Sequence, residues 1–254
     1  MSGPRPATRN HAALLLQSAL FVLGVVALAT MAIEAHSLAY FPGDVTISHV
    51  VQAPSSNWLD EVLGDVSWFG FPPQSNILFG AIVALLFVLG ARWAALTEAI
   101  AAIGSGGVYL LLEQVVAQPR PSADLVRVVG PIDRTGFPSG HLATFVAVFG
   151  FLAFVCYRRL APSRRRFLPI VLVTVLLAVL ALARIYSGHH WASDVAAGAL
   201  LGALWLAVAI RLYAWRSHEP IARSWASLRE SSRCVRDPSR RSRRDRSRLD
   251  WTRS

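Results

Sequence analysis

His190 and Asp194 stand four residues apart in the last third of the sequence. On a helix this spacing puts both side chains on one face, where the carboxylate can accept the imidazole N–H. That contact would fix the tautomer and leave the other ring nitrogen free to attack an electrophile. Arg184, six residues before His190, carries a planar guanidinium suited to phosphate oxygens. Taken alone, a snorkelling arginine and an interfacial histidine would explain the same residues without chemistry.

The adjacent His189 competes for the same carboxylate. Neighbouring residues on a helix point about 100° apart, so only one histidine can pair with Asp194. His190 has the better spacing. We expect His189 to face a lipid headgroup or the substrate.

A second segment, residues 138–141 with the sequence Pro-Ser-Gly-His, opens an apolar run. The N-terminus of a helix binds anions through its free N–H groups and its dipole. Ser139 would add a hydroxyl donor, and His141 could protonate a leaving oxygen. The alternative is that Ser139 only caps the helix and His141 is a polar residue of the interface.

Arg120, placed between two prolines, is unremarkable alone but completes a set. The three segments together hold two arginine forks, an anion-binding helix start, an acid–base histidine and a histidine supported by aspartate. Phosphoryl transfer needs such a set, because the oxygens must be clamped, a nucleophile aligned and the leaving group protonated. No cluster of Cys and His has the spacing of zinc ligands.

The elements that position these residues are membrane spans. The chain is 54% hydrophobic and 16% charged, whereas soluble domains carry about a quarter charged residues. A helix needs about 20 apolar residues to cross a bilayer. We therefore predict an all-α bundle of six transmembrane helices near residues 12–33, 76–96, 98–117, 139–158, 167–184 and 194–215. The first run is longer than a signal-peptide core, so we expect an uncleaved span.

The arginines predict the orientation of these spans. The net charge is +10, and all 25 basic residues are Arg. They concentrate in the N-terminus 1–11, the joint 158–166 and the tail 216–254, which six spans place on one side of the membrane. The positive-inside rule makes that side cytoplasmic. The segments 34–75, 118–138 and 184–193, which hold the motifs, then lie outside the cytoplasm.

Three segments have less defined roles. Residues 49–66 could form an amphipathic helix in the interface, as a lid, a lipid entrance or a simple connector. The Arg- and Ser-rich tail cannot bury a core, so we expect it to be disordered and close to anionic lipids. Membrane orientation explains the basic charge better than nucleic acid, which we do not expect as a partner. Cys156 and Cys234 should remain unpaired, and the sequence leaves the oligomeric state open.

At these motifs, over roughly residues 12–215, the chain resembles the type 2 phosphatidic acid phosphatase superfamily of membrane lipid phosphatases. The family pattern Pro-Ser-Gly-His is intact from Pro138 to His141. Its pattern Ser-Arg, five residues, His, three residues, Asp is intact from Arg184 to Asp194, with Ala183 in the Ser position. The family's remaining pattern is Lys, then six residues, then Arg-Pro. Of this pattern the chain keeps only the Arg-Pro pair, as Arg120 and Pro121.

The resemblance implies a role for each residue. His190 would form a phosphohistidine, Asp194 would orient it, and His141 would protonate the leaving alkoxide and then activate water. The phosphate would be held by Arg120, Arg184, Ser139 and the amide of Gly140. No metal or cofactor is implied. The expected substrate is a lipid phosphomonoester or isoprenyl diphosphate: undecaprenyl diphosphate, phosphatidate or phosphatidylglycerol phosphate. The alternatives are a phosphotransferase to an alcohol acceptor and a non-catalytic lipid-binding protein of the same fold.

Glu113 departs from the family pattern, because it occupies the Lys position seven residues before Arg120. Seven residues are two helical turns, so the carboxylate should face the site and repel phosphate. Glu113 could pair with Arg120 or Arg184 and orient it. Arg127 or Arg134 could supply the lost charge. A third interpretation is weak catalysis or a different substrate.

Overall fold

The structure of the chain is a computed structural model that describes residues 11–54, 56–130 and 135–216. The predicted cytoplasmic N-terminus, most of the Arg-rich tail, Cys234 and Arg134 lie outside these residues. Within them the chain forms helices and one short 3-10 turn, and residues up to Tyr213 belong to one compact unit. The elements are α1 (His11–Ser37), α2 (Asp44–Gln52), α3 (Asn57–Trp68), α4 (Gln74–Val88), α5 (Arg92–Val116), α6 (Gly140–Arg159), η1 (Arg164–Phe167), α7 (Leu168–Tyr186) and α8 (Ala192–Arg216).

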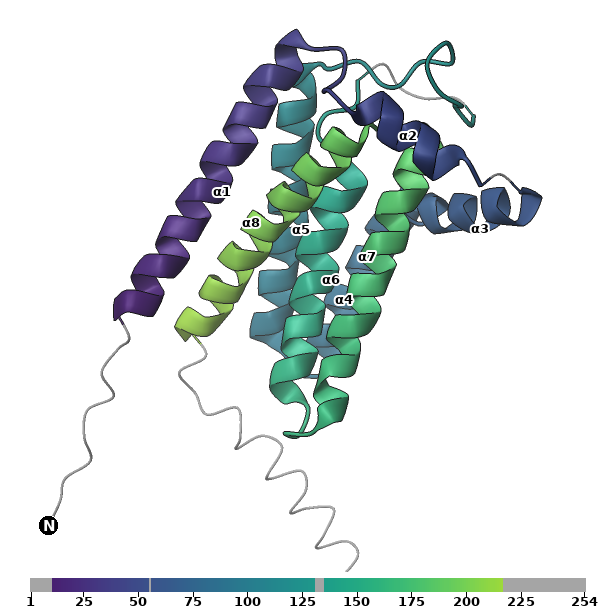
Figure 1. Cartoon of the computed structure of the whole chain (residues 1–254). Coiled ribbons are helices and arrows are strands. Elements are labelled where there is room, and N and C mark those ends of the chain that lie inside the picture. The colour runs from purple at the N-terminus through teal and green to yellow at the C-terminus, as the bar shows by residue number, and fades with distance from the viewer. Residues whose placement is uncertain (1–10, 55, 131–134, 217–254) are drawn as a thin grey trace, which may run out of the picture. The chain divides into compact units, whose positions relative to one another are not determined.

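Five of these helices are long and apolar enough to cross a membrane: α1, α5, α6, α7 together with η1, and α8. They run alongside one another in the bundle of Figure 1. The remaining predicted span, residues 76–96, overlaps α4 and runs into the start of α5, and the 15 residues of α4 make a helix about 22 Å long. That length is short of a hydrocarbon core of about 30 Å, so the sixth span stays a prediction. The chain is a multi-pass membrane protein.

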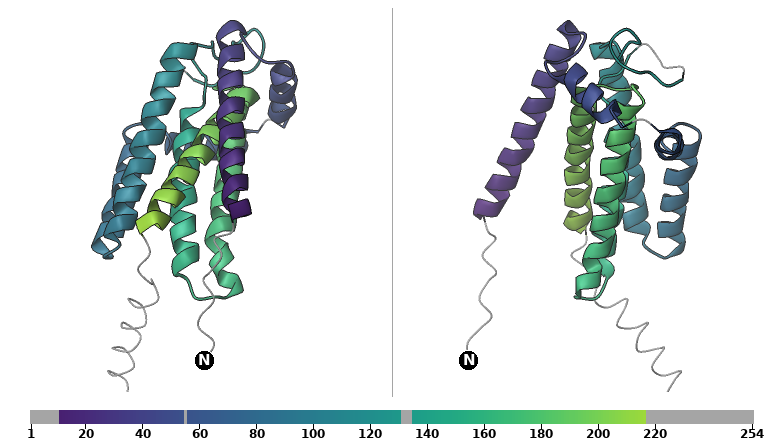
Figure 2. Two further views of the ribbon diagram at one scale, coloured as in Figure 1. Left: turned by 90° about the vertical axis from the view of Figure 1, so that its left-hand side faces the viewer. Right: turned by 45° about the vertical axis from the view of Figure 1, so that its right-hand side comes forward.

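The neighbours within the bundle follow the chain. Helix α4 packs on α5, α5 on α6, and α6 on α7, while α1 also contacts α5. Figure 2 shows α1 lying along the outside of the bundle. Buried apolar side chains from α1, α5, α6 and α8 form a common core beneath the motif-bearing loops, among them Leu28, Val116, Ala143 and Leu201.

Helices α6 and α8 pack closely against each other at two glycines of α8. A Cβ on Gly198 would lie 2.4 Å from the carbonyl oxygen of Ser139, and one on Gly202 would lie 2.6 Å from Cβ of Val146. Small residues four apart let two membrane helices bring their backbones together. This contact joins two of the three motifs, because Asp194 lies one turn before Gly198 and its carbonyl accepts the Ser139 N–H at 3.0 Å.

The segment 34–75, which we predicted to be external, contains two helices, α2 and α3, where we predicted one over residues 49–66. They are separated at residues 53–56, and both contact α7. Helix α3 exposes large apolar side chains such as Trp58, Val62 and Trp68. That exposure agrees with a helix at the membrane surface, but its position in the interface stays a prediction.

Candidate active site

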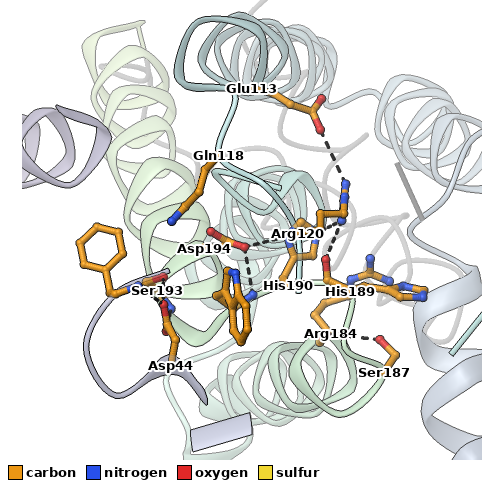
Figure 3. Close-up of polar contacts among 12 residues, drawn as sticks. Asp44, Glu113, Gln118, Arg120, Arg184, Ser187, His189, His190, Ser193 and Asp194 are labelled. Atoms are coloured by element: carbon orange, nitrogen blue, oxygen red, sulfur yellow. Dashed lines mark hydrogen bonds and ion pairs between the residues drawn. The ribbon is translucent and has the colours of Figure 1, made fainter. Parts of the chain in front are cut away.

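The three motif segments meet at the end of the bundle where α5 ends, α6 begins and α7 is joined to α8 (Figure 1). Figure 3 shows the polar contacts of the first and third segments. The C-terminus of α5 leads to Arg120, the start of α6 carries Ser139 to His141, and the junction of α7 and α8 carries Arg184 to Asp194. An isolated bridge between Pro119 and Thr135 and the bond from the Gly136 N–H to the Gln118 carbonyl, 2.9 Å, hold the first two segments together. The convergence expected from the span count is therefore present in the fold.

His190 lies between α7 and α8 and is only 3% exposed. We predicted that it shares a helix face with Asp194, but α8 begins two residues after it. The contact survives because Asp194 sits in the first turn of α8, where its Oδ2 accepts the N–H of Trp191 at 2.9 Å as an acid in a capping box does. The same Oδ2 lies 3.5 Å from Nδ1 of His190.

The contact with Arg120 defines the tautomer of His190. Nη1 of Arg120 lies 3.0 Å from Nε2 of His190, and a guanidinium can only donate hydrogen bonds. Nε2 must therefore be the unprotonated nitrogen, and the proton sits on Nδ1, facing Asp194. Burial, followed by the charges of Arg184 and Arg120, holds the pKa of His190 well below its usual range. The ring is thus neutral, with its nucleophilic lone pair on Nε2.

Several buried donors around His190 have no partner among the described residues. They are Nε and Nη1 of Arg184, Nε of Arg120 and the hydroxyl of Ser139. Ser139 precedes α6, yet its side chain makes no capping hydrogen bond. Buried polar groups are usually satisfied, so a cluster of unsatisfied donors at a helix N-terminus indicates an anion site. Gly140 begins that helix, and a Cβ there would meet the ring of Tyr109 at 2.6 Å.

His141 lies in the first turn of α6 and is 8% exposed. Its Nε2 is 3.2 Å from the carbonyl oxygen of Ser67 at the end of α3. The ring of Phe71 stands edge-on to it at 4.7 Å. The guanidinium of Arg184 lies 5.1 Å from the centre of the same Phe71 ring. Phe71 thus closes the site from the α3–α4 connection, a role that sequence reasoning missed because no motif surrounds this residue.

Glu113 pairs with Arg120, as one of our three interpretations proposed. Its Oε1 lies 3.6 Å from Nη2 of Arg120, and the side chains are 16% and 10% exposed. No such pair joins Glu113 to Arg184 within the described residues. Arg127 is engaged elsewhere: its Nη1 donates to both carboxylate oxygens of Asp60 at 3.0 and 3.2 Å. The other candidate for the missing charge, Arg134, lies outside the described residues.

His189 points away from Asp194 and toward the loop after α5. Its Nε2 lies 2.6 Å from the carbonyl oxygen of Val129, so the N–H on that nitrogen donates to the loop. Its own carbonyl accepts from Nη1 of Arg120 at 2.7 Å. Burial, then the charge of Arg184, lowers the pKa of His189 to about 4. His189 therefore contacts the loop and Phe71, and the expected contact with lipid or substrate stays a prediction.

Helix α2 supplies two polar supports that the sequence did not reveal. Asp44 is 3% exposed, and its carboxylate accepts from the N–H and the hydroxyl of Ser193 at 2.9 and 2.7 Å. Gln52 donates to the carbonyls of Arg127 and Tyr186 at 2.8 and 3.1 Å. Asp44 and Gln52 belong to no recognisable sequence motif. The one signal in the sequence was that Ser193, the partner of Asp44, lies inside a motif segment and would need a hydrogen-bond partner.

No group of three or more His, Cys, Asp or Glu residues is arranged to hold a metal ion in the part of the chain that the structure describes. The side chains gathered at the site are an imidazole with a free lone pair on Nε2, a carboxylate behind it, a second imidazole and two guanidinium groups.

Comparisons with known proteins agree with this arrangement. The family model of the PAP2 superfamily matches residues 93–218. The fold is similar to that of a PAP2-type phosphatidylglycerolphosphate phosphatase from Bacillus subtilis, with a TM-score of 0.70, 21% identity, and coverage of 79% of this chain and 98% of that one. It is also similar to Aquifex aeolicus LpxE, with a TM-score of 0.56, 20% identity, and coverage of 67% and 96%. No curated protein sequence is detectably similar.

The family match spans α5 to α8, which carry all three motifs, and the two structural matches share the bundle that brings the motifs together. The chain belongs to the PAP2 superfamily.

Proposed function

We propose that this protein is a lipid phosphatase that hydrolyses a phosphorylated lipid through a phosphohistidine at His190. The contact of Arg120 with Nε2 carries the proposal, because it places the free lone pair on the nitrogen that faces the unpartnered donors. Asp194 stands behind the opposite nitrogen. A histidine that served only packing would have no need for this arrangement.

The reaction proceeds in two displacements. Arg120 moves from Nε2 to a phosphate oxygen, and Arg184, Ser139 and the start of α6 bind the remaining oxygens. Nε2 then attacks phosphorus, the P–O bond to the leaving group breaks, and His141 gives a proton to the leaving oxygen, which is the lipid alkoxide of a monoester or the lipid phosphate of a diphosphate. The phosphorylated imidazole keeps its proton on Nδ1, and the Asp194 carboxylate balances the resulting positive charge.

The second displacement restores the enzyme. His141 takes a proton from water, the water oxygen attacks phosphorus, and the P–N bond breaks. Inorganic phosphate leaves, and the electron pair of the broken bond returns to Nε2. In the first step His141 must carry a proton, whereas in the second it must accept one. Each proton that it donates is therefore recovered within one turnover.

The substrate is a lipid phosphomonoester or an isoprenyl diphosphate. The Bacillus subtilis relative is described as a phosphatidylglycerolphosphate phosphatase, so phosphatidylglycerol phosphate should be tested first, followed by phosphatidate and undecaprenyl diphosphate. The distribution of Arg supports an active site outside the cytoplasm and cytoplasmic termini. A reporter fused after Ser254 should read as cytoplasmic, and an external reading would reverse the orientation.

Phosphate release from these lipids by the detergent-purified protein tests the proposal. We expect release that survives a chelator and falls by a factor on the order of 10⁴ or more in His190→Ala, because the covalent step is lost. His189→Ala is the matched control, since it removes the neighbouring ring and leaves the Asp194 contact in place. Full activity in His190→Ala would disprove the mechanism.

Two alternatives make different predictions in the same assay. A phosphotransferase would share every residue of the site, and product analysis with an added acceptor alcohol would identify it. Glu113 favours a non-catalytic lipid-binding protein, because its carboxylate neutralises part of the arginine clamp. Such a protein would release no phosphate from any of the lipids.

A further inference from the structure

An apolar groove runs along α6 and α7 toward the ends of these helices that lie farthest from the candidate active site. Its volume is about 280 Å³, and none of the residues that line it is charged. From Val146 to Tyr157 the α6 wall spans twelve residues, about 16 Å along the helix axis. On the α7 wall Ile170 and Thr174 are exposed, so the groove is open to the surroundings of the bundle. Within a bilayer those surroundings are acyl chains.

The end of the groove reaches a dense cluster of arginines. Five lie within the nine residues that end α6 and begin the next helical segment: Arg158, Arg159, Arg164, Arg165 and Arg166. The sequence from His141 to Ser193 contains no Asp or Glu. None of the five arginines forms a salt bridge with another described residue. Their charge is therefore not compensated within the part of the chain that the structure describes.

One contact joins the groove to the arginines. The guanidinium of Arg166 lies 4.8 Å from the centre of the Tyr157 ring, and Tyr157 lines the groove. The same guanidinium lies 5.1 Å from the Phe167 ring. Aromatic rings thus hold the guanidinium of Arg166 at the end of the apolar groove. Membrane orientation would explain basic residues in this loop, but it does not explain a groove that ends on one of them.

We propose that the groove binds one acyl chain of an anionic phospholipid, whose phosphate headgroup contacts Arg164, Arg165 and Arg166. A zwitterionic lipid with the same chains could enter the groove, but its headgroup would gain little from the uncompensated charge. The lipid would occupy the leaflet opposite the candidate active site, because α6 begins at that site with Gly140 and ends twenty residues later at Arg159. The inference does not rest on the proposed function.

Thermal unfolding of the full-length protein in detergent tests this lipid site. Dioleoyl phosphatidylglycerol and dioleoyl phosphatidylcholine share their acyl chains and differ in headgroup charge. We expect the first to raise Tm by about 5 °C near a hundredfold excess over its Kd and the second to have less than half this effect. The two lipids should raise Tm equally little in Thr174→Phe and Val173→Phe, which fill the groove. The same result is expected for the triple variant Arg164→Gln, Arg165→Gln, Arg166→Gln.

Two control variants match these substitutions. Val175→Phe changes the neighbouring residue of α7, which does not line the groove, and Arg92→Gln removes an arginine from the start of α5. Both should keep the full effect of phosphatidylglycerol. Equal stabilisation by the two lipids would overturn the proposal. So would an unchanged shift in both groove variants, because it would place lipid binding elsewhere, including on the Arg-rich tail. Phosphate release should be unchanged in all these variants, and Tm remains measurable if no substrate is hydrolysed.

Discussion

Asp194 and Arg120 both contact His190, but they are held in different ways. Asp194 is fully buried, and its helix meets α6 through glycines that bring the two backbones together. Arg120 follows the end of α5 in an irregular segment, and its closest side-chain partner besides His190 is Glu113 at 3.6 Å. We call the first group of contacts the α6–α8 half of the site and the second the α5 half.

The difference matches what each half has to do. In the proposed mechanism the ring of His190 has to stay in place, so close helix packing suits the α6–α8 half. The α5 half covers Nε2 with Arg120, and the proposed attack by this nitrogen requires the guanidinium to leave first. The ion pair with Glu113 is 3.6 Å long, beyond the usual length of a hydrogen bond, so it can hold Arg120 without preventing its release.

Among the substitutions that test how the two halves are packed, the largest effect is expected at Gly198 in the α6–α8 half. Gly198→Ala would put a methyl group 2.4 Å from the carbonyl oxygen of Ser139, and backbone cannot yield as a flexible side chain can. We expect a loss of about 1–3 kcal/mol in the free energy of unfolding and at least a tenfold loss of phosphate release, because Ser139 and Asp194 would separate. Tm and kcat measured on the same preparation check both.

Gly107→Ala is the matched control for this change. It lies in α5, and a Cβ there would have nothing within 4 Å. Alanine at this position should preserve activity and stabilise the helix by up to about 1 kcal/mol. If Gly198→Ala behaved like Gly107→Ala, the α6–α8 half would not be held by this contact, and the contrast between the halves would fail.

A smaller effect is expected from Glu113→Lys in the α5 half. The new ammonium would repel Arg120 from its present position, uncover Nε2 and add a positive charge near the phosphate. We expect KM to fall severalfold with kcat preserved or raised. Steady-state kinetics of phosphate release measure both. Glu113→Gln removes the ion pair without adding charge, so its KM should lie between that of the unaltered protein and that of Glu113→Lys. A complete loss of activity in both variants would instead show that Glu113 is needed to position Arg120.

The sequence was sufficient to predict the residues of the α6–α8 half. Spans near 139–158, 167–184 and 194–215 correspond to α6, α7 and α8 within a few residues, because each is a continuous apolar run between polar joints. The four-residue spacing of His190 and Asp194 also indicated their contact correctly. The helical geometry assumed for it was wrong, because a capping contact at the start of α8 replaces a shared helix face.

The contacts that α2 and the α3–α4 connection make with the site could not be predicted in the same way. Phe71, Asp44 and Gln52 reach the site or its supports through contacts between residues far apart in sequence, such as Gln52 with Tyr186. Helical periodicity carries no information on such contacts, which depend on how loops pack after the helices have assembled. For the same reason the single helix predicted over residues 49–66 became two.

His189 lies at the seam of the two halves, and its titration offers the most subtle test of how they are joined. It donates to Val129 in the loop and accepts from Arg120, and its pKa falls to about 4 through burial and the charge of Arg184. In the unfolded chain the pKa of a histidine is about 6.5. Between these values the unfolded state binds the extra proton, so the free energy of unfolding should decrease as pH falls from about 6.5 toward about 4.

His189→Gln keeps an N–H for the Val129 carbonyl and removes the titrating group, so its unfolding free energy should fall less over this range. His190 also has a lowered pKa, and some pH dependence should therefore remain. Denaturant unfolding of both proteins at pH 4.5 and pH 7 measures the difference. Identical changes in the two proteins would mean that His189 is not buried at the seam, and that the loop of the α5 half stands away from the α6–α8 half in solution.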